Sequence, residues 1–354
     1  MAGVQRVGDS ESMQALRLIA HGAPGQFVLQ DLPIPEPQEG EVLVRIHSCG
    51  LNHLDLWLEE KGLPMPIALP RTPGCEAAGE VARLGPKTRG WKVGERVCIA
   101  SNLCCGACEW CRDRKESMCI KNQILGVDRD GGLAEFVALE ARHLVRLPED
   151  VTYETAAALT LAGSTAMHML TDRVEVRSKD WVLVIGGASG VGSAAIQIAR
   201  QLGGRVIALA SSEPKRTLSS SLGAEFVLDS NDPQWAREVR HLTGKRGVDV
   251  VVEHVGGDTF LRALDCLARG GSIVTCGATA GREIQLNLWP LFVKQQRLIG
   301  SYGRNRADLE RTLEWAESGK LKPVIDRIFQ LKDAPKAFEA LRQRQVLGKV
   351  LINP

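Results

Sequence analysis

A regular alternation of apolar strands and amphipathic helices fills residues 180–301, and no other feature of the sequence limits the fold as much. The predicted strands are short and rich in Val, Ile and Leu. We expect strands at residues 181–185, 205–210, 225–228, 248–253, 272–276 and 297–301, with helices at 190–203, 214–222, 233–243 and 258–268. Because strand–helix–strand units with short connections hold their strands in parallel, the sequence predicts an α/β fold with a doubly wound parallel sheet.

The first strand of this array ends in a glycine-rich turn. Residues 186–192 read Gly-Gly-Ala-Ser-Gly-Val-Gly and lead into the first helix. In the G-x-G-x-x-G fingerprint, glycines allow a tight turn and the close approach of a pyrophosphate, which the free N–H groups of the helix bind. Ser189 stands at the middle glycine position here, and a turn needed only for packing is the alternative interpretation. The residues expected at a dinucleotide are Gly187, Ser189, Gly190, Val191 and Gly192.

The end of the second strand indicates which dinucleotide binds. NAD sites place Asp or Glu about 20 residues beyond the fingerprint, where the carboxylate binds the ribose hydroxyls. This chain has Ser211 and Ser212 there, and Lys215 and Arg216 follow. Hydroxyls and cations attract a 2′-phosphate, whereas a carboxylate repels it. Glu213 is the only acid nearby in the sequence, and we expect it to point outward. NADP(H) is therefore favoured, unless the two cations form only a solvated helix face.

Five of the ten cysteines lie within residues 104–119. Clustered cysteines in a reducing compartment indicate a metal or catalysis more than disulfides. Four of them follow the spacing C-x2-C-x2-C-x7-C: Cys105, Cys108, Cys111 and Cys119. This spacing allows four thiolates to converge on one tetrahedral Zn²⁺, and four protein ligands make the site structural. Cys104 lies outside the spacing. An iron–sulfur cluster and a coincidental grouping are the alternatives.

The first third and the tail of the chain have a different pattern. Short strand-like segments and turns predict an irregular, mostly antiparallel β domain, and an Ala-rich helix is expected at residues 155–170. The expected strands are residues 13–19, 41–47, 74–84, 96–99, 132–139 and 143–147. The tail from residue 307 has two helical stretches around a strand at 324–331 and ends in a strand at 349–352, so we expect it to return to the β domain.

Composition excludes two classes of partner. The chain has 44 Lys+Arg against 42 Asp+Glu, a formal net charge of +2, and lacks the basic face of a nucleic-acid binder. The longest apolar run, residues 181–199, is interrupted by Gly and Ser, so no membrane span is predicted. Residues 1–12 are polar and lack the apolar core of a secretory signal, and we interpret them as a leader before a second start at Met13. We expect a cytoplasmic protein.

Several motifs resemble those of the medium-chain dehydrogenase/reductase superfamily, which includes zinc alcohol dehydrogenases and quinone oxidoreductases. Besides the cysteine lobe, the matching segments are Gly50-Leu51-Asn52-His53-Leu54-Asp55, Pro73-Gly74-Cys75-Glu76-Ala77-Ala78-Gly79, Gly94-Glu95-Arg96-Val97 and Gly348-Lys349-Val350. The resemblance covers nearly all of residues 13–354. It implies a GroES-like β domain at residues 13–160 and 303–354, with the zinc lobe at 104–119, and a Rossmann domain at 161–302.

The same resemblance implies further site residues and partners. It places Thr165 and Gly277 at the cofactor, beside the glycine turn. It implies a small-molecule substrate and a homodimer or homotetramer.

The chain departs from zinc alcohol dehydrogenases at the three positions that hold their catalytic zinc. The resemblance aligns Asn52, Cys75 and Leu161 with those ligands, and a leucine cannot bind metal. We therefore expect no catalytic zinc. A different metal site formed by Cys75 with His53, Asp55 and Glu76 stays open as an alternative, as does a nucleophilic role for the Cys75 thiol.

These residues favour an NADPH-dependent oxidoreductase that transfers hydride to an activated C=C bond of an enone, quinone or enoyl-type substrate. Without a metal, the candidate donors to the substrate oxygen are Asn52, His53 and a ribose hydroxyl of the cofactor. The proton for the α-carbon comes from water or a side chain, for which Tyr302 is the candidate. One alternative is a zinc-type alcohol dehydrogenase or carbonyl reductase. The other is a non-catalytic NADPH-binding redox sensor, which keeps the glycines but has lost the catalytic groups.

Overall fold

The computed structural model describes residues 12–354, so the predicted leader lies outside the described residues except for Ser12. The chain forms two compact units. The first contains residues up to 161 together with 305–317 and 325–354, and the second contains residues 162–304 and 318–324. The tail therefore contributes to both units, because residues 318–324 belong to the second.

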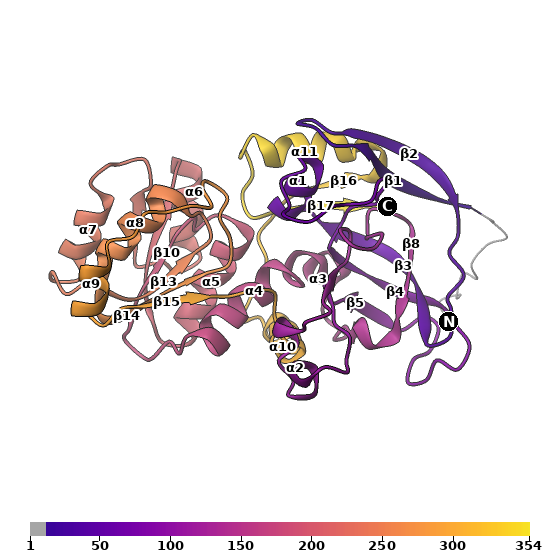
Figure 1. The fold of residues 1–354 in the computed structure, drawn as a ribbon, viewed down its shortest axis with the longest axis horizontal. Helices are drawn as coiled ribbons and strands as arrows, with labels where there is room; N and C mark the ends of the chain where they lie inside the picture. The colour runs from indigo at the N-terminus through magenta and orange to yellow at the C-terminus, as the bar shows by residue number, and fades with distance from the viewer. Residues whose placement is uncertain (1–11) are drawn as a thin grey trace. The chain divides into compact units, whose positions relative to one another are not determined.

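A seven-stranded sheet forms the centre of the first unit (Figure 1). Its strands are β3 (Glu41–Gly50), β4 (Glu76–Leu84), β5 (Arg96–Ile99), β8 (Phe136–Glu140), β9 (Leu144–Arg146), β16 (Ile325–Gln330) and β17 (Lys349–Asn353). The order is β16-β17-β3-β4-β5-β9, and β8 pairs with β3. Every pairing is antiparallel except β16 with β17. The predicted antiparallel character is confirmed, and the tail joins this sheet through β17.

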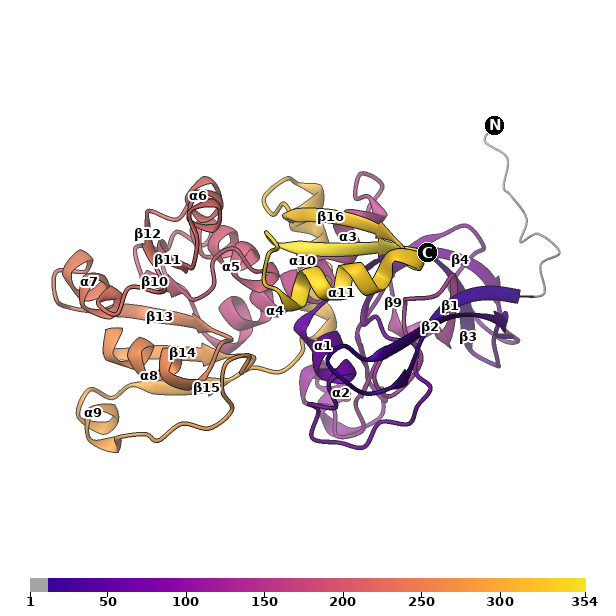
Figure 2. The same cartoon turned by 90° about the horizontal axis from the view of Figure 1, so that it is seen from above.

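Two small strand pairs and five helices complete the first unit. The strands are β1 (Ser12–Ala20) with β2 (Gln26–Pro33), and β6 (Asn102–Leu103) with β7 (Gln123–Ile124). The helices are α1 (His53–Glu59), α2 (Glu109–Arg112), α3 (Tyr153–Leu159), α10 (Arg306–Glu317) and α11 (Ala334–Arg342). Single-turn 3-10 helices lie at Glu116–Met118, Ala141–His143 and Leu331–Asp333. Helix α11 packs along β16 and β17 (Figure 2) and buries Phe338 and Leu341 in the sheet's main core.

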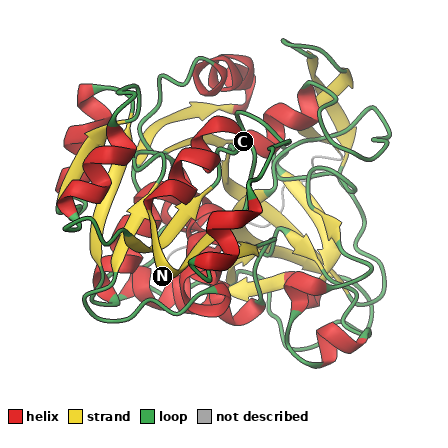
Figure 3. Cartoon of the chain, turned by 60° about the vertical axis from the view of Figure 1, so that its left-hand side comes forward, coloured by secondary structure: helices red, strands yellow, loops and turns green. Residues whose placement is uncertain are grey.

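The second unit is a six-stranded parallel sheet, and helices connect its successive strands along the chain (Figure 3). The strands are β10 (Trp181–Val184), β11 (Arg205–Ala210), β12 (Phe226–Asp229), β13 (Val248–Glu253), β14 (Leu267–Thr275) and β15 (Arg297–Gly300). The helices are α4 (Ala162–His168), α5 (Gly190–Gln201), α6 (Glu213–Ser221), α7 (Trp235–Leu242), α8 (Gly257–Cys266) and α9 (Leu288–Val293).

The strand order, β12-β11-β10-β13-β14-β15, reverses between β10 and β13. This order defines a doubly wound Rossmann sheet, whose ligands bind at the carboxyl ends of the strands where the order reverses. The central strands are almost fully buried because helices cover both faces of such a sheet, which explains their continuous Val, Ile and Leu runs. The predicted α/β fold is confirmed.

The structure differs from the local predictions in several places. The helix expected at 155–170 is divided into α3 and α4, followed by a π-helical turn at Met169–Arg173. Helices α1 and α9 were not predicted, since each is shorter than two full turns and gives little periodic signal. Within the described residues, none of the helices combines the length and apolar character that crossing a membrane requires.

Candidate active site and zinc lobe

Four thiols converge in the lobe between β6 and β7. The Sγ atom of Cys105 lies 4.0 Å from that of Cys111 and 3.6 Å from that of Cys119, and the Sγ atoms of Cys108 and Cys111 are 3.5 Å apart. All four sulfur atoms lie within 4.8 Å of one another. A tetrahedral zinc with Zn–S bonds of about 2.3 Å requires sulfur separations of about 3.8 Å. The thiols therefore fit a closed, structural zinc site.

Backbone N–H groups of the lobe donate hydrogen bonds to two of these sulfurs. The N–H of Cys108 donates to the Cys105 sulfur at 3.4 Å, and the N–H of Cys105 donates to the Cys119 sulfur at 3.3 Å. Backbone N–H donors from Ala107 and Cys108 lower the pKa of the Cys105 thiol to about 6, which favours the thiolate that binds metal. The Cys104 sulfur instead donates to the backbone carbonyls of Asn102 and Glu116.

The glycine turn connects β10 to α5 at the carboxyl end of the sheet. Ser189 is the N-cap of α5, and its Oγ accepts a hydrogen bond from the N–H of Gly192 at 2.9 Å. A Cβ at Gly192 would lie 2.1 Å from the carbonyl oxygen of Gly186, so only glycine allows the helix to approach the turn this closely. Gly186 itself has a φ of +64°, which favours glycine. The turn thus has the backbone geometry that a dinucleotide fingerprint requires.

The other predicted cofactor residues lie on the second unit as well. Ser211 and Ser212 follow β11, with Ser212 as the N-cap of α6, and Thr165 is buried in α4. Gly277 follows β14, where a Cβ would lie 3.1 Å from the carbonyl oxygen of His254. Val191 is the second residue of α5.

Two carboxylates surround Arg216. Its guanidinium contacts Glu213 and Asp229, each at 2.8 Å. Glu213 is exposed as expected, but it is not the only acid near the predicted phosphate site. The sequence argument missed Asp229 because β12 brings it beside β11 through sheet pairing. These two carboxylates therefore already balance the positive charge of Arg216. Lys215 is half-buried on the same helix.

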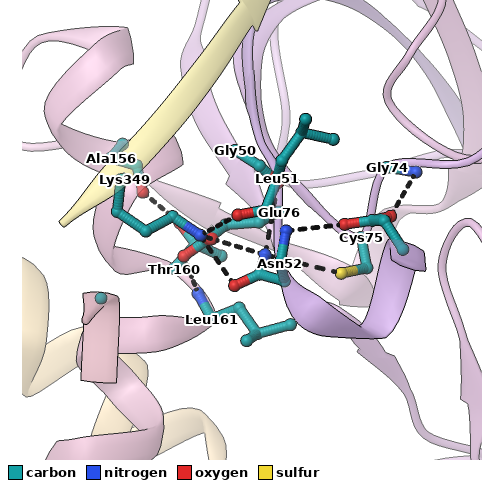
Figure 4. A network of polar contacts seen from close by, with 12 residues as sticks. Gly50, Leu51, Asn52, Gly74, Cys75, Glu76, Ala156, Thr160, Leu161 and Lys349 are labelled. Carbon is teal, nitrogen blue, oxygen red and sulfur yellow. Dashed lines mark hydrogen bonds and ion pairs between the residues drawn. The ribbon is translucent and has the colours of Figure 1, made fainter. Parts of the chain in front are cut away.

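A closed polar network includes Asn52 and extends to Leu161, two of the three residues that the resemblance aligns with catalytic zinc ligands (Figure 4). The Nζ of Lys349, on β17, donates to the Oδ1 of Asn52 at 2.7 Å and to the carbonyl oxygen of Leu51 at 2.6 Å. It also pairs with the Oε2 of Glu76 at 2.6 Å. The Nδ2 of Asn52 donates to the same carboxylate oxygen at 2.9 Å and to the carbonyl of Gly50 at 3.3 Å. The amide of Asn52 is thus engaged on both sides.

The same carboxylate also contacts Leu161, which the resemblance aligns with the third zinc ligand. The backbone N–H of Leu161 donates to the Oε1 of Glu76 at 2.5 Å. Glu76 and Lys349 are 0% and 4% exposed, so this is a buried ion pair with its hydrogen-bonding groups satisfied. Figure 4 shows the lysine, the carboxylate and the asparagine side by side.

This arrangement does not fit a metal ion. Across residues 12–354, the lobe cysteines are the only group of three or more His, Cys, Asp or Glu side chains whose ligand atoms converge. Burial raises the pKa of the Cys75 thiol well above its usual range, which disfavours the thiolate needed for a ligand or a nucleophile. Lys349 supplies a positive charge where a second cation would have to bind. The alternative metal site around Cys75 therefore does not assemble.

Two titratable side chains of α1 lie beside the network. Burial, together with the charges of Arg344 and Lys349, lowers the pKa of His53 to about 4, so its imidazole is neutral at physiological pH. Burial raises the pKa of Asp55 to about 6, although the N–H groups of Asn52 and Gly74 donate to its carboxylate at 2.8 and 3.1 Å. Asp55 caps the start of α1 through its bond with the N–H of Asn52.

Tyr302 follows β15 in the second unit and is 56% exposed. Its proposed role as proton donor stays a prediction. The sequence reasoning named Glu76 and Lys349 but missed that they pair. The signal was a charge at the first position of each strand, directly before an apolar run, since Glu76 begins β4 and Lys349 begins β17.

Two family models match the chain. They are the alcohol dehydrogenase GroES-like domain over residues 38–149 and the zinc-binding dehydrogenase over residues 190–318. An alcohol dehydrogenase of Geobacillus stearothermophilus is 31% identical over 92% of this chain and 95% of its own length.

Solved structures agree with these matches. An NAD-dependent alcohol dehydrogenase superposes with a TM-score of 0.92 at 38% identity, covering 97% of this chain and 100% of the other. The 2-octenoyl-CoA carboxylase reductase CinF, in complex with NADP and 2-octenoyl-CoA, superposes with a TM-score of 0.89 at 26% identity, covering 97% and 88%.

Proposed function

The chain belongs to the medium-chain dehydrogenase/reductase superfamily, and from this premise we propose that it is an NADPH-dependent reductase of activated C=C bonds that works without a catalytic zinc. The observation that supports the proposal is the closed network of Asn52, Glu76 and Lys349, which engages residues that the resemblance aligns with catalytic zinc ligands. The similarity to a reductase solved with an enoyl-CoA supports the same substrate class.

The chemistry explains why the missing metal favours this reaction. Hydride addition to a simple carbonyl concentrates negative charge on one oxygen, which a zinc ion stabilises as a Lewis acid. Hydride addition to the β-carbon of an enone spreads the charge over an enolate, which fixed hydrogen-bond donors can stabilise. Bound NADPH would supply the hydride. The protein's own contribution is then to orient the substrate, donate hydrogen bonds to its oxygen and protonate the α-carbon.

We divide these tasks among the candidate residues. Asn52 already donates to Glu76 and Gly50, so we assign it the role of a positioning residue that holds the start of α1. His53 is neutral and can still donate through one ring N–H, which makes it the candidate donor to the substrate oxygen. Tyr302 is the candidate proton donor to the α-carbon.

The cofactor preference rests on the end of β11. Ser211 and Ser212 stand where an NAD site carries an acid, and Lys215 adds a positive charge nearby. The two acids paired with Arg216 oppose a 2′-phosphate, so Lys215 and the two hydroxyls carry the expected preference for NADPH. A Ser211→Asp variant should shift the preference toward NADH.

An NADPH-oxidation screen tests the proposal. Purified protein, with its zinc counted on the same sample, is offered enones, quinones, enoyl thioesters and simple aldehydes. We expect one zinc per chain, turnover with at least one conjugated acceptor, little with aldehydes, and no response to added zinc. Alcohol oxidation that needs added zinc would support a zinc-type alcohol dehydrogenase instead. Tight NADPH binding without turnover of any acceptor would support a redox sensor.

We also propose that the protein is a cytoplasmic homo-oligomer. Exposed apolar side chains gather on α9 and the neighbouring edge strand β15. They are Leu288, Trp289, Phe292, Val293 and Leu298. An edge strand can pair with its own copy across a two-fold axis, which would cover this apolar surface. Sedimentation should show a dimer or tetramer, and a Leu298→Lys variant should shift it toward the monomer.

A further inference from the structure

A histidine from a neighbouring strand contacts the glycine turn. His254 follows β13, the strand that pairs with β10 where the sheet order reverses. Its Nε2 lies 3.2 Å from the Oγ of Ser189, the residue at the middle glycine position. A Cβ at Gly186 would lie 3.0 Å from the same nitrogen, so the imidazole lies directly against the turn.

The main chain holds this histidine firmly. The carbonyl oxygen of His254 accepts a hydrogen bond from the Oγ1 of Thr279 at 3.4 Å, and a Cβ at Gly277 would lie 3.1 Å from the same oxygen. The buried carboxylate of Glu253 accepts hydrogen bonds from the N–H groups of Val255 and Gly256, each at 2.7 Å. These hydrogen bonds anchor the backbone at His254 and at the residues that follow it.

The hydrogen-bonding capacity of Ser189 links the imidazole to the turn. A hydroxyl has one hydrogen to donate and two lone pairs that accept. One lone pair of the Ser189 Oγ already accepts the N–H of Gly192 at 2.9 Å. If the His254 Nε2 carries no hydrogen, the hydroxyl donates to it. If the Nε2 carries a hydrogen, the Oγ accepts a second bond and its own hydrogen can point to a ligand.

We propose that His254 is a positioning residue for the cofactor pyrophosphate, acting through Ser189. Phosphate oxygens at a helix N-terminus only accept hydrogen bonds. When a dinucleotide is bound, the Ser189 hydroxyl therefore donates to a phosphate oxygen, and the His254 imidazole takes the Nε2–H tautomer so that it can donate to Ser189. The inference rests on the proposed function, because it requires a dinucleotide at the glycine turn. It also explains how a serine replaces the middle glycine without loss, since its hydroxyl becomes a contact.

The tautomer can be measured directly. Protein with ¹⁵N-labelled histidine is titrated with ADP-ribose, which carries the pyrophosphate but no nicotinamide, and the His254 signals are assigned by their loss in His254→Gln. We expect ADP-ribose to move His254 to the Nε2–H tautomer, with no such change in Ser189→Gly. An Nε2 without hydrogen in the bound protein would overturn the inference, because the hydroxyl would then donate to the imidazole.

Binding constants provide the second measurement. Loss of one neutral hydrogen bond corresponds to an affinity change of about threefold, and His254→Leu should weaken NADPH, NADH and ADP-ribose alike by about that factor. Adenosine 2′-phosphate, which has no pyrophosphate, should bind unchanged. In the Ser189→Gly background, His254→Leu should have no effect. His254→Gln, which keeps an N–H donor, should retain the wild-type affinity, as should the control His241→Gln on α7.

These outcomes separate the inference from the proposed function. If the wild-type protein binds none of the dinucleotides, both fail. If it binds them and His254→Leu weakens NADPH and adenosine 2′-phosphate by the same factor, the histidine is only structural and the inference alone fails. An undiminished effect of His254→Leu in the Ser189→Gly background would contradict it in the same way.

Discussion

Breaking the buried ion pair between Glu76 and Lys349 should destabilise the first unit strongly. In Lys349→Met, a side chain of similar length replaces the ammonium, and the carbonyl of Leu51 and the Oδ1 of Asn52 lose their donor. In Glu76→Gln, the buried ammonium loses its counter-charge. Both groups are almost completely buried, so solvent cannot replace the lost partner in either variant.

The loss of unfolding free energy depends on which charged or polar groups each variant leaves buried without a partner. Removing one member of a buried pair costs about 3–5 kcal/mol. Lys349→Met should fall at the lower end, about 3 kcal/mol, because the carboxylate of Glu76 keeps the N–H of Leu161 and the amide of Asn52. In the double variant neither group is left charged and buried. Its cost should be about 3–4 kcal/mol, well below the sum of the two single variants.

Urea unfolding measures these free energies, with zinc held constant and each unit followed separately. A matched control is Lys336→Met, because Lys336 pairs with Asp333 at 2.8 Å on the exposed surface of the same unit. That variant should change stability by less than about 0.5 kcal/mol. Single variants within about 1 kcal/mol of wild type, or a strictly additive double variant, would refute the reasoning.

Three further predictions concern the lobe, the cofactor and pH. Cys108→Ser should reduce the zinc content from one per chain to none by elemental analysis, and should lower the melting temperature, because three thiolates no longer close the tetrahedral site. NADPH should bind at least about tenfold more tightly than NADH, about 1.4 kcal/mol, and Lys215→Ala should weaken only NADPH in a fluorescence titration; equal dissociation constants for the two cofactors would contradict this. Burial lowers the pKa of His53 from 6.5 to about 4, so its contribution to stability is complete above pH 6.5 and is lost as the pH falls toward 4. His53→Gln should therefore lose less stability than wild type between about pH 7.5 and about pH 4.5 in urea titrations, and an equal loss would exclude this role.

The features that could be predicted from the sequence are those that neighbouring residues determine. The lobe cysteines lie within residues 105–119, and their spacing alone brings the sulfurs together. The glycine turn is equally local, and its conformation depends on Gly186 and Gly192. The alternation of strands and helices is periodic, so it predicted the parallel sheet and even the bounds of β11 and β13.

Two other features depend on residues far apart in the chain: the polar network around Glu76 and Lys349, and the charges near the carboxyl end of β11. Lys349 and Asn52 are separated by 297 positions and meet only because β17 pairs with β3. Asp229 reaches Arg216 because β12 pairs with β11. Sequence spacing gives no distance between such groups, so the residues that the resemblance aligns with zinc ligands could be read from the sequence, whereas the ion pair between Glu76 and Lys349 could not.

The discontinuity of the first unit has a consequence for how the protein is made. As a nascent chain leaves the ribosome, residues 162–304 are complete before β17 exists, so the parallel sheet has all six of its strands while the antiparallel sheet still lacks its Lys349. During that interval Glu76 has no counter-charge, and burying it alone would be costly. The second unit therefore completes its fold before the first, although the first unit's residues begin to be translated earlier. This order is the reverse of the usual N-terminal-first folding during synthesis.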